Sequence, residues 1–444
     1  MSHSDVASSV RGALGGIAGG RLQALPFTLR FWDGSTLAGE SATPVTVVRS
    51  PRALTYLLRA PNQVGLARAW VTGALDVEGD LEAILAARER FRGVALSAAD
   101  RLKLLAAAMR AAPSVLVRRA PVPSIEAVPR GRRHSLARDR TAVRHHYNVS
   151  NDFYRLVLGE SLTYSCAYFA APGDTLESAQ ARKHELICRK LQVAAGERLL
   201  DIGCGWGSLL LHAAGRYGVR AVGVTLSESQ AEVARRRVRD AGLSDLVEVR
   251  VSDYREIGDG PFDKVVSVGM YEHVGRAELG RYAQTVAGLL RPGGLFLNHG
   301  IARLASEPPQ SDTFISRYIF PDGELHPVTE IEAAMQAAGL EVRDVESLRE
   351  HYPLTLRRWL ANLEANHARA VALVGEERER AWRLYMLASA TGFEDGDITV
   401  YQVLAARLGA DHHLPLDRAE LLAPARLEQV EPSVTHQREA GDAG

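Results

Sequence analysis

A glycine-rich string, DIGCGWG at residues 201–207, comes directly after a run of apolar residues and before a segment with helical spacing. Glycines at alternate positions, such as Gly203 and Gly205, let the backbone pass close beneath a ligand and leave N–H groups free at the start of a helix. The spacing is GxGxG and not the GxGxxG of dinucleotide-binding folds, and the next apolar run ends in VTL at 224–226, where an NAD-binding protein often carries a carboxylate. The string predicts a cofactor site and disfavours NAD; the alternative is a tight turn without a ligand.

This string belongs to a regular alternation of strand-like and helix-like segments that begins near residue 185. The strand-like segments are ERLLDIGCG, VRAVGVTLS, VEVRVSD, PFDKVVSVGM and GGLFLNHGI, and the helix-like ones are WGSLLLHAAGRYG, ESQAEVARRRVRDAG and ELGRYAQTVAGLL. Strands that are apolar nearly throughout predict an α/β fold, a doubly wound parallel sheet with helices on both faces. Ligands of such sheets bind at the carboxyl ends of the strands. Residues 302–326 and 355–400 break the alternation, and we expect them to form a helical lid over that site.

A small α+β domain is predicted upstream, because residues 25–95 contain shorter alternating segments. LPFTLRFWDGSTLAG predicts a hairpin that turns at Asp33-Gly34, whereas PRALTYLLRA and LEAILAARERF have helical spacing. The predicted organisation is a disordered terminus, an amino-terminal α+β domain, a basic linker, the α/β domain and a loosely ordered tail. Their boundaries are 1–20, 21–115, 116–140, 141–410 and 411–444.

Composition excludes several classes of protein. The 444 residues contain 53 Lys plus Arg and 53 Asp plus Glu, and a net charge of zero argues against a dedicated nucleic-acid binder. Three cysteines are too few and too irregularly spaced for a disulfide scaffold or a four-ligand zinc site, so we expect no metal and a reducing, cytoplasmic location. No apolar run approaches the ~18 residues of a spanning helix.

One segment departs from this charge balance. Residues 110–144 contain nine arginines against two acidic residues, Glu126 and Asp139. Such a segment is either a solvated linker or a surface for anionic lipid head groups, in which case each Arg near the head groups adds roughly 1 kcal/mol.

Beyond these features, the sequence resembles a known family. Asp201 before the glycine loop and Asp253 after the third strand are similar to the pattern of class I S-adenosylmethionine (SAM) methyltransferases, whose ligand is a sulfonium cation with an amino-acid tail. Nine strings in order over roughly residues 140–410 resemble the cyclopropane-fatty-acyl-phospholipid synthase family. They are HHYNVSNDFY (145–154), LTYSCAYF (162–169), DIGCGWG (201–207), GVTLSESQ (223–230), SDYREI (252–257), SVGMYEHVG (267–275), NHGI (298–301), YIFPDGEL (318–325) and HYPLTLRRW (351–359).

The resemblance implies a reaction: a methyl group passes from SAM to a cis double bond of a phospholipid acyl chain, and a bound bicarbonate deprotonates the resulting carbocation so that a cyclopropane ring closes. The family's bicarbonate-holding positions match Cys166, Glu272, His299, Ile301 and Tyr352. Each has a simpler reading as a buried, capping or core residue. Since a Glu beside an anion needs a proton or bridging donors, we predict that the pKa of Glu272 is raised or that it shares a proton with the bicarbonate.

Further positions are carried over by the same resemblance. The cofactor contacts are Tyr164, Ser165, Asp201, Gly203, Gly205, Trp206, Thr225, Gln230, Asp253 and Tyr254. Aromatic residues that could line an acyl channel are Tyr147, Phe169, Tyr271, Tyr318 and Phe320. Each of these, like Trp206, could instead be a core residue. The resemblance also implies peripheral association with the anionic inner face of the membrane, and a homodimer.

Three other functions remain open at this point. The same cation could lose a proton from a neighbouring chain carbon and give a methylene-branched fatty acyl chain. A lipid-binding protein that has lost catalysis would not need the glycine loop. A methyltransferase for a small nitrogen or oxygen nucleophile would need a polar pocket and would not explain the basic segment or the amino-terminal domain.

Overall fold

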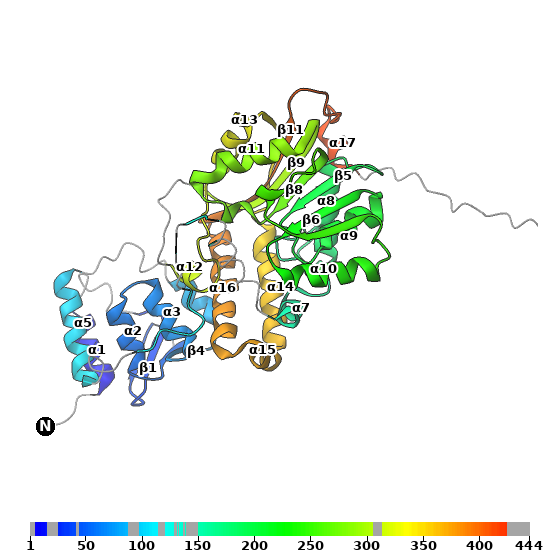
Figure 1. Ribbon diagram of the computed structural model, residues 1–444. Helices are drawn as coiled ribbons and strands as arrows, with labels where there is room; N and C mark the ends of the chain where they lie inside the picture. The colour runs from blue at the N-terminus through cyan, green and yellow to red at the C-terminus, as the bar shows by residue number, and fades with distance from the viewer. Residues whose placement is uncertain are drawn as a thin grey trace, which may run out of the picture.

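The computed structural model describes residues 5–15, 25–40, 44–87, 97–113, 120–127, 131, 133–135, 138, 150–304 and 313–423. It contains a seven-stranded sheet and a separate four-stranded sheet. Figure 1 shows the large sheet at one end of the molecule, the small one at the other, and the long helices α14 and α16 between them. No helix within the described ranges is both long and apolar enough to cross a bilayer.

The large sheet has the strand order β10-β11-β9-β8-β5-β6-β7. Its predicted strands are β5 (Arg198–Ile202), β6 (Arg220–Thr225), β7 (Val247–Val251), β8 (Phe262–Val268) and β9 (Leu290–Arg303), and they run parallel. The prediction of a parallel, doubly wound sheet is confirmed for these five. Two strands that we did not predict complete the sheet: β11 (Ile398–Arg407) is antiparallel to β9, and β10 (Leu340–Ser347) is antiparallel to β11.

Helices cover both faces of this sheet. One face carries α8 (Leu176–Lys190), α9 (Ser208–Tyr217) and α10 (Glu228–Asp240), whose apolar side chains form a single cluster with those of β5 and β6. The other face carries α11 (Leu279–Leu289) and α13 (Val328–Ala337). Short 3-10 turns follow β7 and β8, namely η4 (Tyr254–Glu256), η5 (Tyr271–His273) and η6 (Arg276–Glu278). The carboxyl ends of β5 to β8 therefore meet at one open edge, where the glycine loop lies.

The small sheet has the order β2-β1-β3-β4. Its strands are β1 (Thr28–Phe31), β2 (Thr36–Leu37), β3 (Val45–Val48) and β4 (Leu75–Glu78). The predicted hairpin is confirmed: β1 and β2 pair antiparallel, and Gly34 in the turn between them has a φ of +84°. Around the sheet lie α2 (Arg52–Arg59), α3 (Gln63–Val71), α4 (Leu81–Ala86) and α5 (Ala98–Ala111).

Both chain ends contain more structure than we expected. Within residues 1–20, predicted to be disordered, the structure has helix α1 (Val6–Leu14), which packs against α5. Asp5 caps α1, and the N–H of Val6 donates to Asp33 Oδ2 at 3.0 Å. The buried residues of α1 are Val6, Ala7 and Ala13, and the Gly-, Ser- and Ala-rich composition of residues 1–20 concealed this short apolar face. In the predicted tail, α17 (Arg418–Leu422) packs on α8, and residues 424–444 lie outside the described ranges.

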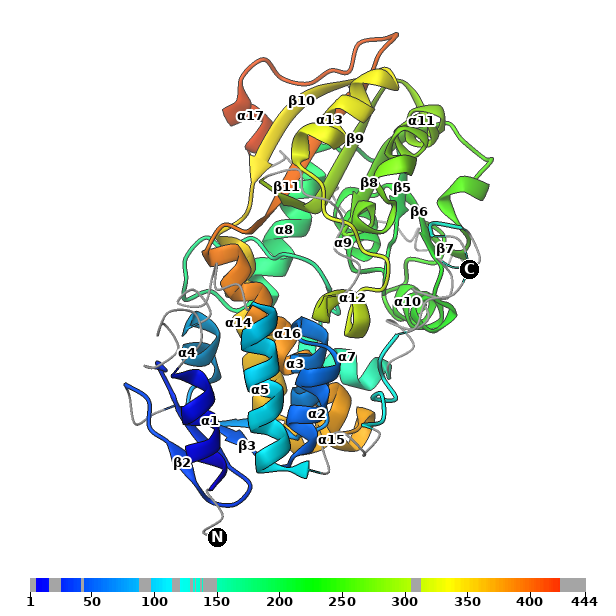
Figure 2. The same cartoon turned by 90° about the vertical axis from the view of Figure 1, so that its left-hand side faces the viewer.

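The predicted lid segments contain α12 (Phe314–Tyr318), and α14 (His351–Ala365), α15 (His367–Val374) and α16 (Glu376–Glu394). Figure 1 and Figure 2 show α16 beside the amino-terminal part, and α16 packs against α3 and α4 of that part. The Trp70 indole on α3 donates to the backbone carbonyl of Arg380 on α16 at 2.9 Å, and the Arg380 guanidinium donates to the carbonyl of Trp70 at 2.7 Å. The same guanidinium stacks 4.3 Å from the indole centroid. Helix α16 is thus attached directly to α3, and a further hydrogen bond from Arg380 to the carbonyl of Leu75 joins it to the amino-terminal sheet.

Much of the basic segment lies outside the described residues. Of its nine arginines, Arg110, Arg133 and Arg138 are described. Arg138 forms a two-pronged ion pair with Asp322, and Arg133 lies within 3.4 Å of both Asp322 and Glu324. These two arginines are therefore engaged with the YIFPDGEL loop.

Candidate active site

The glycine loop closes the end of β5 and begins α9. Gly203 and Gly205 have φ values of +86° and +54°, in the left-handed region that side chains with a Cβ rarely adopt. The N–H groups of Gly203 and Cys204 both donate to the carbonyl of Val224 at the end of β6. Arg237 on α10 donates to the carbonyl of Trp206. The loop is thereby held across the ends of β5 and β6.

A pocket opens over this loop. All ten residues predicted to contact the cofactor line it, and they come from the carboxyl ends of the strands and the turns after them, from the segment before α8 and from the first turn of α10: Tyr164, Ser165, Asp201, Gly203, Gly205, Trp206, Thr225, Gln230, Asp253 and Tyr254. Sequence reasoning therefore identified a set of residues that the fold brings together. Which of them contact the cofactor stays a prediction.

Hydrogen bonds orient the polar groups of the pocket. Thr225 Oγ1 lies 2.9 Å from Gln230 Oε1, and Asn151 Oδ1 accepts from the Trp206 indole at 2.9 Å. Asp253 forms a two-pronged ion pair with Arg255. The pKa of Asp201 is raised to about 7, because burial disfavours its charged form. The pocket thus has polar groups held at the ends of β5, β6 and β7.

The five predicted bicarbonate-holding residues do not line this pocket. Glu272, in η5 after β8, is joined to one of them: its Oε1 accepts the N–H of Ile301 at 2.8 Å. Its other oxygen, Oε2, is buried without a hydrogen-bond partner among the described residues. Burial raises the pKa of Glu272 to about 7. The raised pKa that we predicted is confirmed, and its cause in the structure is desolvation.

His299 lies two residues before Ile301 on β9, so both side chains leave the same face of the strand. Its Nδ1 is 3.2 Å from Gln402 Nε2, whereas its Nε2 is buried and has no hydrogen-bond partner in the described part of the chain. Burial lowers its pKa well below the usual value, so the ring is neutral. Because the Gln402 amide donates to Nδ1, the ring hydrogen lies on Nε2, which is therefore a buried donor.

Tyr352 lies in the first turn of α14, and Cys166 lies near the residues that precede this helix. The Cys166 thiol is fully buried, 3.8 Å from the carbonyl of Leu348, and burial raises its pKa. Tyr352 packs on Phe393, with ring centroids 4.5 Å apart. A thiol in this state is protonated and can act as a weak donor but not as a base.

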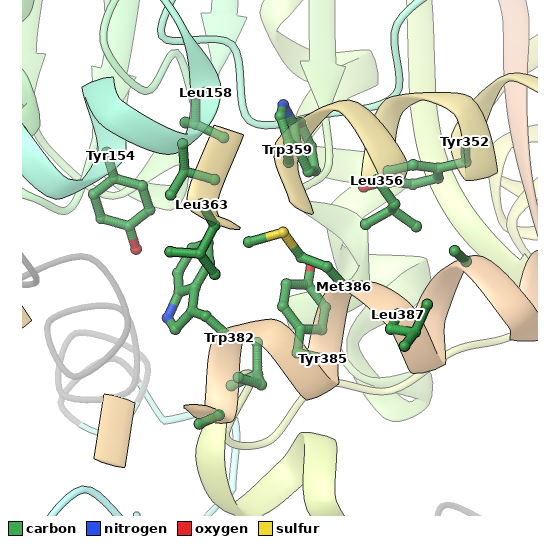
Figure 3. Close-up of a cluster of buried hydrophobic side chains, with 14 of the residues drawn as sticks. Tyr154, Leu158, Tyr352, Leu356, Trp359, Leu363, Trp382, Tyr385, Met386 and Leu387 are labelled. Atoms are coloured by element: carbon green, nitrogen blue, oxygen red, sulfur yellow. The ribbon is translucent and has the colours of Figure 1, made fainter. Parts of the chain in front are cut away.

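An aromatic cluster separates the pocket from the amino-terminal domain. In Figure 3, Leu356 and Trp359 on α14 face Trp382, Tyr385 and Met386 on α16. Tyr164 connects this cluster to the pocket: it lines the pocket, its ring is stacked 5.7 Å from that of Trp382, and its hydroxyl lies 3.3 Å from that of Tyr385. The cluster also includes Tyr154 from α7 (Asn151–Leu158).

The residues predicted to line an acyl channel are scattered. Phe320 packs against Tyr164 and Tyr385 and so lies at the aromatic cluster. Phe169 and Tyr318 are buried elsewhere in the same core, whereas Tyr271 belongs to the core on the α11 side of the sheet, where its hydroxyl donates to the carbonyl of Ile301. Tyr147 lies outside the described residues.

Sequence reasoning missed Lys183, which lines the pocket from α8. The signal was present: Leu176, Ala179, Lys183 and Ile187 recur at helical spacing on the buried face of α8, and a lysine on such a face is rare. It also missed His273, another lining residue, whose pKa burial lowers to about 4.

Comparison with known proteins is consistent with this geometry. A family model described as mycolic acid cyclopropane synthetase matches residues 134–403. The chain is 42% identical over 405 residues to a probable fatty acid methyltransferase of Pseudomonas putida, covering 89% of this chain and 96% of that protein. It is 37% identical over 273 residues to the cyclopropane-fatty-acyl-phospholipid synthase of Escherichia coli K12, covering 62% of this chain and 69% of that protein.

Among solved structures, the mycolic acid cyclopropane synthase CmaA1 complexed with SAH and CTAB is similar. Its sequence is 35% identical, the TM-score is 0.57, and the match covers 60% of this chain and 98% of that one. The matched part of that fold therefore binds S-adenosylhomocysteine (SAH), the demethylated form of SAM.

Proposed function

We propose that this chain, which belongs to the mycolic acid cyclopropane synthetase family, converts a cis double bond of an unsaturated phospholipid acyl chain into a cyclopropane ring. The chain is a SAM-dependent methyltransferase that acts on fatty acyl chains. The finer proposal rests on one observation, the position of Tyr164. Its side chain lines the cofactor pocket and packs in an apolar aromatic cluster, where a chain with a double bond would meet the donor.

The chemistry explains why such surroundings suit the reaction. An alkene has no proton to remove before attack, so the protein must chiefly align the double bond with the methyl group, and alignment of this kind contributes ~7 kcal/mol or more. The product of attack is a carbocation, which water would convert to an alcohol. Trp359, Trp382 and Tyr385 are almost wholly buried, so their faces exclude water, and each face near the cation contributes ~1 to 2 kcal/mol.

Two orphaned polar atoms fit the bicarbonate that the family resemblance implies. His299 Nε2 offers a hydrogen to an anionic oxygen, and Glu272 Oε2 offers a lone pair to a hydroxyl, whereas the N–H of Ile301 already donates to Glu272. Bicarbonate, when bound, supplies the base that removes a proton from the new methyl group. The role of Glu272 is to hold at Oε2 the proton that comes from the methyl group. The role of Gln402 is to orient the His299 ring through its hydrogen bond to Nδ1.

This role of Glu272 predicts a pH profile. With its pKa at about 7, the carboxyl group is neutral below that pH and can accept a proton only above it. We therefore expect kcat at saturating SAM to rise between about pH 6 and about pH 8. SAM must be saturating because Asp201 also has a pKa of about 7 and lines the cofactor pocket. Its titration would change the KM for SAM, which does not affect kcat. A kcat that falls over this range contradicts the role.

The product test uses labelled SAM, liposomes of a mono-unsaturated phospholipid, and mass spectrometry of the released fatty acids. We expect a gain of one CH2 and loss of the double bond. A gain of one CH2 with a surviving double bond would instead identify the methylene-branched product, which the name of the Pseudomonas relative, a fatty acid methyltransferase, does not exclude. No label in the lipid would overturn both reactions.

We propose in addition that the amino-terminal domain and the basic segment bring the protein to the anionic face of the membrane, where its substrate lies. Arg133 and Arg138 contribute less than their charge suggests, because both are paired with acidic side chains. The remaining arginines of that segment, other than Arg110, lie outside the described residues.

A further inference from the structure

Lys183 is a buried cation with spare hydrogen-bonding capacity in the cofactor pocket. Lys183 is 2% exposed and lines the pocket. Its ammonium carries three hydrogens, and Nζ donates to Ser165 Oγ at 3.0 Å. Within the described part of the chain it forms no ion pair with a carboxylate. Asp201 acts on Lys183 electrostatically but forms no direct ion pair with it, and burial of an ammonium without a directly paired carboxylate is costly, so the position favours an anionic ligand.

The other buried lysines show what is usual in this protein. Lys190 is paired with Asp344 and Glu346 at 3.2 and 2.6 Å, and Lys264 is paired with Glu197 at 3.5 Å. Lys183 differs from both because it lines the pocket and, among the described residues, has no carboxylate within ion-pair distance, although Asp201 acts on it electrostatically. Desolvation lowers its pKa to about 7, and a bound anion would restore its charge.

The surroundings hold Lys183 in position. One turn earlier on α8, Gln180 Nε2 donates to the carbonyl of Ser165 at 2.9 Å. Gln180 therefore binds the backbone carbonyl of Ser165, and Lys183 binds the hydroxyl of the same residue. Ser165 is in turn fixed to a rigid 15-residue helix.

The other charged side chains of the pocket indicate which group of the ligand Lys183 would bind. Arg255 is already paired with Asp253, at the end of β7. Asp201, at the end of β5, interacts electrostatically with Lys183. The amino-acid tail of SAM carries one carboxylate and one ammonium, which need one cation and one anion side by side.

We propose that Lys183 Nζ, positioned by Ser165, binds the carboxylate of the amino-acid tail of SAM, while Asp201 faces the ammonium of that tail. The proposal rests on SAM as the methyl donor and adds the residue that recognises its carboxylate. Lys183 is then the pocket's selectivity residue for the intact amino-acid tail.

The test compares two ligands that differ only in this carboxylate, SAM and decarboxylated SAM, by calorimetry on the full chain. Lys183→Met should weaken SAM binding about 10- to 100-fold, the range for a hydrogen bond to a charged group, and should leave the binding of decarboxylated SAM unchanged or tighter. Lys183→Arg, which keeps the charge, should recover part of the preference for SAM. The control is Lys264→Met, which removes a buried lysine that does not line the pocket and should leave the ratio of the two affinities unchanged.

Three results would count against the proposal. Equal weakening of both ligands by Lys183→Met would show a structural role only. Unchanged affinities with a reduced kcat would show that Lys183 acts on the reaction and not on the carboxylate. Failure of the unmodified protein to bind either ligand would overturn the donor assignment itself. If Lys183→Met does not fold, the same ratio measured with Ser165→Ala, which removes the positioning hydroxyl, decides: an unchanged preference for SAM overturns the proposal.

Discussion

Glu272→Gln is expected to lower kcat by about 100-fold or more while leaving the affinity for SAM nearly unchanged. The carboxamide keeps the size of the side chain and can still accept the N–H of Ile301, so the local fold should survive. It cannot take up a proton at the position of Oε2, which is the function assigned to that buried atom. The measurement is kcat at saturating SAM together with the dissociation constant of SAM.

The control for this substitution is Glu278→Gln, a carboxylate in η6 that pairs with Arg281 near the surface. It should retain normal turnover. Cys166→Ser should also lower product formation with SAM affinity intact, because Cys166 is one of the residues carried over to the base site. Parallel loss of turnover and SAM affinity in Glu272→Gln would contradict the proton-holding role assigned to Glu272.

Arg68→Met is expected to reduce the free energy of unfolding by about 3 kcal/mol. Arg68 on α3 makes two hydrogen bonds to Glu126, at 2.8 and 2.7 Å, and Tyr318 on α12 donates to the same carboxylate at 2.9 Å. The Glu126 side chain is only 1% exposed, so removal of the guanidinium would leave a buried charge without its partner. Urea unfolding followed by tryptophan fluorescence would measure the loss.

A double substitution separates this cause from simple loss of packing. Arg68→Met combined with Glu126→Gln should be less damaging than the single change, because no charge is left buried. The exposed pair Arg30–Glu78 is the matched control, and Arg30→Met should cost less than about 1 kcal/mol. A double variant as unstable as the sum of the single ones would contradict the explanation.

Local patterns predicted the parts of the fold that depend on local physics. The Asp33-Gly34 turn and the five apolar strands follow from residue type and spacing alone. Strand β10 was missed because Asp344 and Glu346, which pair with Lys190, stand on its more buried face and break the apolar alternation typical of a strand. Strand β11 was missed because it follows long helices and pairs with β9, about 100 residues earlier. Neither pairing can be read from nearby residues.

The candidate site likewise contains residues that the sequence could predict and contacts that it could not. The glycine loop was predicted from residue spacing and the other cofactor residues from the family resemblance, and the fold brings all ten of them to one pocket. The aromatic cluster was not predicted, because Tyr164 meets Trp382 and Tyr385 only after α14 and α16 fold back over the sheet. The orphaned atoms of Glu272 and His299 could not be predicted either, since burial and the loss of partners are properties of the packed protein.

The reciprocal contact between Trp70 and Arg380 has a mechanical consequence. Each residue both donates and accepts a hydrogen bond. The amino-terminal domain therefore cannot shift relative to α16 at this point without breaking both hydrogen bonds. Trp382 and Tyr385 follow Arg380 within two turns of the same helix. A force applied to the amino-terminal domain is therefore transmitted along α16 to Trp382 and Tyr385, which belong to the aromatic cluster beside the cofactor pocket.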